Sequence, residues 1–87
     1  MTSKSAAAIE LTLYGRNACH LCEDMQQALQ ELQESIGFSF KWVDIDADPG
    51  LYERYNTQVP VLMHDDREIC HYFLDPEALK SYFRQEA

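Results

Sequence analysis

A helical pattern lies between two strand patterns in the first half of the chain, and this order restricts the possible folds more than any other feature. Apolar residues recur at helical spacing at Leu21, Met25, Leu29, Leu32 and Ile36, and Gly37 follows where a helix would end. Alternating apolar residues precede this segment at 9–14 and follow it at 38–45. Two strands joined through a helix are expected to run parallel, with a right-handed crossover.

The second half of the chain predicts a short helix, two strands and a last helix. The expected ranges are 49–55 for the short helix, 59–63 and 68–73 for the strands, and a helix that begins at Asp75-Pro76. Asp65-Asp66 is the expected hairpin turn between the two strands. Apolar residues on both faces of 38–45 predict that this earlier strand is covered on both sides, as in a parallel sheet.

The length and composition are those of one small α/β domain. The chain has 87 residues, 46% of them hydrophobic, and we expect a domain at 9–87 after a loose tail at 1–8. A net charge of -8 argues against nucleic acid or an anionic membrane as a partner, and no apolar run approaches the roughly 20 residues that span a bilayer. Three cysteines cannot form a closed set of disulfides, and no secretory signal is visible, so we expect a cytoplasmic protein. We also expect it to be a monomer.

Two of the three cysteines, Cys19 and Cys22, stand three positions apart where the first helix should begin. The first N–H groups of a helix lack partners within the helix and carry partial positive charge. A thiolate accepts hydrogen bonds from such groups, and its pKa falls. In thiol–disulfide exchange, Cys19 would be the exposed nucleophile and Cys22 the sheltered cysteine that resolves the mixed disulfide.

A zinc site is the alternative interpretation of this pair. Two cysteines at this spacing supply half of a tetrahedral site, and the other ligands would have to come from His20, His64, Cys70 or His71. Cys70 and His71 are adjacent on an expected strand, so their side chains should point to opposite faces. We therefore favour a redox pair and expect no metal, with Cys70 as a small apolar filler of the core.

The segment Gln58-Val59-Pro60 is the second feature that suggests a site. A proline at the start of a strand removes one donor of the sheet, which fits an edge strand or a loop end. The alternative is a cis Val59-Pro60 bond that leaves the Val59 backbone unpaired and facing the cysteines. That backbone could then pair with an extended substrate or with glutathione, as a short added strand.

Four motifs together resemble the glutaredoxin-like family, over roughly residues 9–83. They are Leu13-Tyr14-Gly15-Arg16, Cys19-His20-Leu21-Cys22, Val43-Asp44-Ile45-Asp46 and Val59-Pro60-Val61-Leu62. The resemblance implies a thioredoxin-like, glutaredoxin-type three-layer sandwich. Its mixed four-stranded sheet and three helices would follow the order βαβαββα.

The resemblance also implies roles for single residues. Cys19 matches the attacking cysteine, Cys22 the resolving cysteine and Pro60 the cis-proline. The backbone of Val59 matches the one that pairs with substrate, and Arg16 matches a basic residue near the glycine carboxylate of glutathione. Three further positions are expected to bind substrate: His20 and Leu21, which replace the family's usual Pro and Tyr, and Gln58, which replaces its Thr. Cys70 and His71 stand where the family has two glycines that allow close approach to glutathione.

We therefore expect a glutaredoxin-like thiol–disulfide oxidoreductase. Its substrate would be a protein disulfide or a low-molecular-weight disulfide, and glutathione or a thioredoxin reductase would restore the dithiol without any required cofactor. Two alternatives remain. One is a non-catalytic binding or redox-sensing module that holds an extended peptide beside Val59-Pro60. The other is a metal site shared between two chains through Cys19.

Overall fold

The computed structural model describes residues 9–86, and the loose tail expected at 1–8 lies outside this range. The elements are β1 (Glu10–Gly15), α1 (His20–Ile36), β2 (Ser39–Asp44), the short 3₁₀ helix η2 (Ile45–Ala47), α2 (Pro49–Tyr55), β3 (Val61–His64), β4 (Arg67–His71) and α3 (Pro76–Glu86). The predicted order βαβαββα is confirmed.

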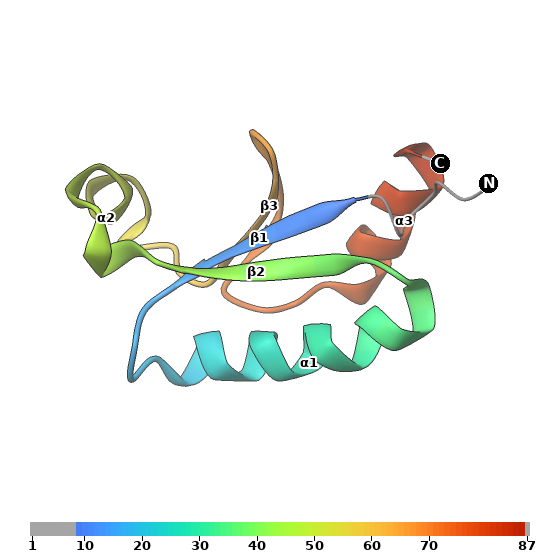
Figure 1. Ribbon diagram of the computed structural model, residues 1–87, viewed down its shortest axis with the longest axis horizontal. Helices are drawn as coiled ribbons and strands as arrows, with labels where there is room; N and C mark the ends of the chain where they lie inside the picture. Colours follow the sequence, from blue (N-terminus) through green and yellow to red (C-terminus); the bar gives the residue numbers. More distant parts are fainter. Residues whose placement is uncertain (1–8, 87) are drawn as a thin grey trace.

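The four strands form one mixed sheet in the order β2-β1-β3-β4. Strand β1 runs parallel to β2 and antiparallel to β3, and its Leu13 lies opposite Trp42 on one side and Leu62 on the other. Strands β3 and β4 form an antiparallel hairpin. Helix α1 lies along one side of the sheet and α2 at one end of it (Figure 1).

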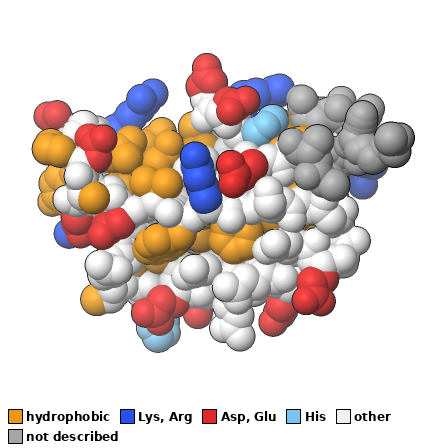
Figure 2. Space-filling view, in the orientation of Figure 1, with side chains coloured by type: hydrophobic (Ala, Val, Ile, Leu, Met, Phe, Trp, Pro, Cys, Tyr) orange, Lys and Arg blue, Asp and Glu red, His pale blue; other side chains and the backbone are white. Residues whose placement is uncertain are grey.

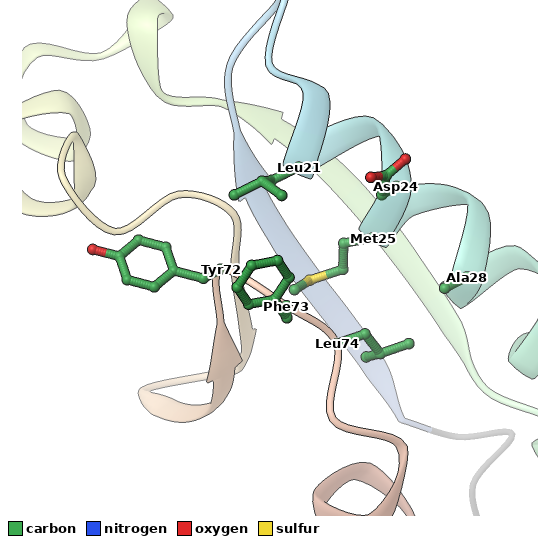
Figure 3. Close-up of a pocket in the computed structure, with 7 residues that line it drawn as sticks. All are labelled: Leu21, Asp24, Met25, Ala28, Tyr72, Phe73 and Leu74. Atoms are coloured by element: carbon green, nitrogen blue, oxygen red, sulfur yellow. The ribbon is translucent and has the colours of Figure 1, made fainter.

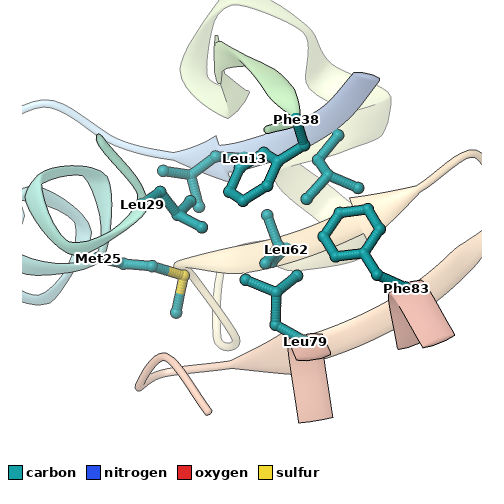
Figure 4. Close-up of a cluster of buried hydrophobic side chains, with 8 residues drawn as sticks. Leu13, Met25, Leu29, Phe38, Leu62, Leu79 and Phe83 are labelled. Carbon is teal, nitrogen blue, oxygen red and sulfur yellow. The ribbon is translucent and has the colours of Figure 1, made fainter. Parts of the chain in front are cut away.

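Two apolar cores lie on the two faces of the sheet. The larger core joins α1 and α3 to β1 and β3 (Figure 4); its buried residues are Leu11, Leu13, Met25, Leu29, Phe38, Leu62, Leu79 and Phe83. The smaller core joins η2 and α2 to β3, through Ile45, Tyr55, Val61 and Met63. Helices therefore cover both faces, which makes three layers and confirms the predicted sandwich.

Strand β2 lies at the edge of the sheet and is covered on one face only, so the prediction that it is covered on both sides is wrong. Its Ser39 and Lys41 are exposed, and Phe40 and Trp42 are only partly buried. The strand that is buried on both faces is β3, with Val61, Leu62 and Met63 all buried. The cause is the hairpin: β3 pairs with β1 on the side away from β2 and β4 pairs with β3, so the sheet extends away from β2 and leaves it with one neighbour.

Most strand boundaries lie within a residue or two of the sequence predictions, and three differences have a local cause. Strand β3 begins at Val61, because Pro60 has no N–H group to donate to a neighbouring strand. Strand β4 ends at His71, because Tyr72 has a left-handed backbone with φ 66°. The turn expected at 46–50 contains the end of η2, because Asp44 accepts a hydrogen bond from the Asp46 N–H at 2.9 Å.

The predicted helix ends are confirmed. Asp48 accepts a hydrogen bond from the Gly50 N–H at 2.9 Å, with Pro49 at the first position of α2. Asp75 accepts one from the Ala78 N–H at 3.1 Å at the start of α3. Gly37 ends α1 with φ 89°.

The surface agrees with the acidic composition. Acidic side chains are spread over the face seen in Figure 2, with hydrophobic side chains exposed between them. Within residues 9–86, no helix has the length and apolar character needed to cross a membrane.

Candidate redox site

The two cysteines of the motif form a disulfide at the start of α1. Cys19 is the N-cap residue, and its Sγ accepts a hydrogen bond from the Cys22 N–H at 3.1 Å. Cys22 lies one turn inside the helix and is fully buried, whereas Cys19 is partly exposed. Their Cα atoms are 5.2 Å apart, a normal separation for a disulfide. The expected pair of one accessible and one sheltered sulfur is therefore present.

The end of β1 holds the buried sulfur in place. A Cβ atom on Gly15 would lie 2.6 Å from Cζ3 of Trp42 and 3.1 Å from Sγ of Cys22. Only a residue without a side chain lets the indole ring and the sulfur pack this closely against the strand. This role of Gly15 was not predicted, although a glycine at the end of a strand, directly before the cysteine loop, was the available signal.

Arg16 is held on the side of the site that faces η2 and α2. Its Nε donates a hydrogen bond to Asp46 Oδ2 at 3.1 Å, and its guanidinium lies 5.2 Å from the centre of the Tyr52 ring. The side chain stays 39% exposed, so a charged group could still approach it. Its predicted role in binding a carboxylate stays a prediction, and Asp46 and Tyr52 are neighbours that the sequence did not reveal.

The Val59-Pro60 bond is cis, as the sequence analysis proposed in one of its two interpretations. The prediction that the Val59 backbone is unpaired is wrong for the N–H group, which donates a hydrogen bond to the Tyr55 carbonyl at 3.1 Å. The Gln58 N–H donates to the same carbonyl at 2.8 Å. The end of α2 therefore takes up both N–H groups, because the chain turns back tightly after that helix.

Tyr72 ties the cis-proline loop to the end of β4. Its N–H donates to the Pro60 carbonyl at 2.8 Å, and its hydroxyl donates to the Thr57 carbonyl at 2.6 Å. The left-handed backbone that glycine would favour falls at Tyr72, not at Cys70 or His71. No local sequence signal marks this residue, because its role depends on the position of the loop.

A pocket of about 230 Å³ opens beside the cysteines. Helix α1 contributes Leu21, Asp24, Met25 and Ala28, and the segment after β4 contributes Tyr72, Phe73 and Leu74 (Figure 3). Neither cysteine lines the pocket, but Leu21 stands between them in sequence and Tyr72 is bonded to the cis-proline loop, so the pocket lies next to the redox pair. Its neighbour His20 is exposed on the first turn of α1, and its predicted contact with substrate stays a prediction.

Cys70 lies away from this pair, partly buried on β4 and packed against the larger core. Burial raises the pKa of its thiol, and the nearby Asp75 and Glu68 charges add to this, against a backbone hydrogen bond at Asp75 that lowers it. The expected role as an apolar filler agrees with this position. Among the described residues, no three His, Cys, Asp or Glu side chains gather in a way that could hold a metal ion.

The chain matches the glutaredoxin-like domain (DUF836) family over residues 10–84. It is also similar to two solved structures, protein Ne2328 from Nitrosomonas europaea and protein XcR50 from X. campestris. The first is 39% identical, with a TM-score of 0.80, and the match covers 95% of this chain and 99% of that one. The second is 34% identical, with a TM-score of 0.70, and the match covers 86% and 96%.

More distant structures share the fold alone. Glutaredoxin C1 from populus tremula x tremuloides is 15% identical with a TM-score of 0.53, over 92% of this chain and 79% of that one. Because the family match spans almost all of the described residues, the chain belongs to the glutaredoxin-like domain family, and its fold is that of thioredoxin. The resemblance read from the four sequence motifs is confirmed.

Proposed function

We propose that this protein is a thiol–disulfide oxidoreductase in which Cys19 attacks and Cys22 resolves. The observation that carries the proposal is the position of Cys19, whose Sγ already accepts a hydrogen bond from a helix N-terminal N–H group. The same group, with the positive end of the helix dipole, would stabilise a Cys19 thiolate. Cys22 is buried behind it, out of reach of an external disulfide but one helical turn from Cys19.

The reaction proceeds in two exchanges. The Cys19 thiolate attacks one sulfur of the substrate disulfide, that bond breaks, and the other substrate sulfur leaves as a thiolate that takes up a proton. Cys22 then loses its proton to solvent and attacks Sγ of Cys19, which releases the second substrate thiol. The two electrons gained by the substrate come from the protein dithiol, which ends as the Cys19–Cys22 disulfide.

The surroundings supply contacts for a substrate. The Val59 carbonyl precedes the cis bond and accepts no hydrogen bond from the described residues, so it can receive an N–H group of an extended chain. Arg16, beside Asp46 and Tyr52, is partly exposed and could contact a carboxylate of the substrate. Glutathione or a thioredoxin-type reductase would return the disulfide to the dithiol, and no resident cofactor enters the scheme.

The test is disulfide reduction by the pre-reduced protein, followed by thiol release. Cys19→Ser should lose all turnover, whereas Cys70→Ser should keep the wild-type rate because Cys70 lies outside the site. Equal activity in Cys19→Ser and wild type would overturn the proposal. If the wild-type protein reduces no disulfide, and Cys19→Ser still binds the peptide, the binding module is favoured instead.

The source of electrons needs a separate experiment. The oxidised protein is incubated with glutathione and, in parallel, with a thioredoxin reductase system, and its free thiols are then trapped and the products weighed. A glutathione adduct on Cys19 supports glutathione as reductant, and a free dithiol only in the second reaction supports the reductase.

A further inference from the structure

We propose that the pocket between α1 and the segment after β4 recognises a protein segment, in which a large apolar side chain and a basic residue accompany the substrate cysteine. This inference rests on the proposed function and names its substrate class. The pocket is lined by the apolar side chains of Leu21, Met25, Phe73 and Leu74, and Figure 3 shows Met25 reaching toward Phe73, with Leu21 above them and Leu74 below. We call this lining the Leu21–Phe73 groove.

The groove leaves one large aromatic side chain in water, although Met25 beside it is buried and Leu21 and Leu74 are half-buried. Phe73 is 68% exposed, the highest value among the large hydrophobic residues that the structure describes. A phenylalanine in water next to other apolar side chains loses contact with water when a second apolar group covers it, which favours binding. The exposed ring therefore points to an apolar group on the substrate.

The backbone holds the aromatic residues in place before any substrate arrives. The Phe73 N–H donates to the His71 carbonyl at 2.7 Å, and Tyr72 is fixed by its two hydrogen bonds to the cis-proline loop. The left-handed conformation of Tyr72 is unfavourable for a residue with a side chain. A surface that is already ordered loses little conformational entropy on binding, which suits recognition.

Charge and continuity identify the partner. The groove ends at Leu21, the sequence neighbour of Cys22, so a segment that continues past Leu21 toward the start of α1 would bring its own cysteine toward Cys19. Asp24 is the one charged residue among those that line the pocket, Glu23 beside it is exposed, and the chain has a net charge of -8. A lysine or arginine on the substrate is attracted to these acidic groups, whereas glutathione is a small anion without a large apolar side chain.

The test uses three synthetic peptides, each with one internal disulfide. The first has Leu beside a cysteine and Lys further along, the second has Ser in place of Leu, and the third has Glu in place of Lys. The measured quantity is the second-order rate constant for reduction by the pre-reduced protein.

Wild type should reduce the Leu peptide about tenfold faster than the Ser peptide, as expected when a leucine side chain is largely buried in the complex. Phe73→Ser should bring the two rates within about twofold, and the conservative Phe73→Leu should keep most of the preference. Equal rates for the two peptides in wild type, or faster reduction of glutathione disulfide than of the Leu peptide, would overturn the proposal.

The charge contact has its own matched pair of variants. Wild type should reduce the first peptide, which contains Lys, about threefold faster at low salt than the third peptide, which contains Glu. Asp24→Asn should remove this preference. Glu34→Gln removes the same charge from an exposed position further along α1, outside the groove, and should keep it. The same loss in both variants would mean that only net charge matters, which contradicts a specific contact at Asp24.

A binding measurement separates this proposal from the redox function. The Leu peptide with both cysteines replaced by serine is titrated into the protein and followed by amide chemical shifts. Shifts centred on Leu21, Ala28 and Phe73 support the groove even if no peptide is reduced, in which case the redox function alone fails. Disulfide reduction without these shifts leaves the redox function in place and overturns the groove.

Discussion

The two ends of helix α1 both require a left-handed residue, but the chain meets that requirement in different ways. At the C-terminal end Gly37 has φ 89°, and no atom lies within 4 Å of the place where its Cβ would be. At the N-terminal end Ala18 has φ 57°, a conformation that its Cβ disfavours. The residue that caps the helix there is Cys19, which is not among the preferred N-cap residues.

The difference indicates what each end serves. The C-terminal end uses the residue that costs least in this conformation, and its N–H donates to the Gln33 carbonyl at 2.8 Å. The N-terminal end accepts a less favourable residue and an unusual cap, and it places a sulfur atom where helix N–H groups converge. Stability accounts for the first end, and the thiol–disulfide chemistry that we propose would account for the second.

The largest effect on stability should come from Gly15→Ala, at the N-terminal side of this comparison. The new methyl group would press on Trp42 and on the Cys22 sulfur, so we expect a loss of about 2 kcal/mol in the free energy of unfolding. Urea unfolding of the reduced proteins measures it. Gly50→Ala, where the new atom would lie 3.3 Å from Oδ1 of Asp48, should cost much less. Equal costs would contradict close packing at Gly15.

The next effect should come from Gly37→Ala, at the other end of the helix. Because the site is open, the cost is the left-handed backbone alone, and we expect about 1 kcal/mol. Gly37→Asn should cost less, since asparagine tolerates this conformation better. Thermal unfolding of the three proteins gives the order, and an alanine variant as stable as wild type would remove this end from the comparison.

Replacing the cap separates helix stability from chemistry. In the reduced protein, Cys19→Ala removes the acceptor of the Cys22 N–H and should cost about 1 kcal/mol. Cys19→Ser should cost little, because a hydroxyl caps well, yet it should lose all disulfide reduction. Unfolding in the presence of reductant is the measurement. A serine variant as unstable as the alanine variant would show that Cys19 does not act as a cap.

The smallest effect should come from Ala18→Gly, and its sign should be opposite. Glycine removes the cost of the left-handed backbone, which is roughly 1 kcal/mol. Part of this gain is offset, because glycine loses more conformational entropy on folding than alanine does. We therefore expect a gain of about 0.5 kcal/mol in the free energy of unfolding of the reduced protein. A loss of stability would mean that the alanine methyl group makes contacts that outweigh its backbone conformation.

The sequence predicted the elements well because their signals are local. The helical spacing from Leu21 to Ile36, the glycine after it and the caps at Asp48 and Asp75 depend on neighbours in the chain. The disulfide of Cys19 and Cys22 is local as well, since both belong to one helical turn. The cis bond at Pro60 was one of two interpretations, and only the folded loop distinguishes them.

The parts that the sequence did not predict depend on distant segments. Strand β2 has apolar residues on both faces, yet the hairpin determines that it lies at the edge of the sheet. The Val59 N–H is paired because α2 ends beside it. Tyr72 and Phe73 lie fifty residues from the cysteines in sequence, and the pattern of apolar residues placed them in a strand rather than beside Leu21.

The most direct test of the central claim is to trap the mixed disulfide. Cys22→Ser removes the resolving sulfur, so a pre-reduced variant treated with a peptide disulfide should accumulate one covalent adduct. Mass spectrometry of the digested protein should place that adduct on Cys19. An adduct on Cys70, or no adduct while the wild-type protein turns over, would contradict the account.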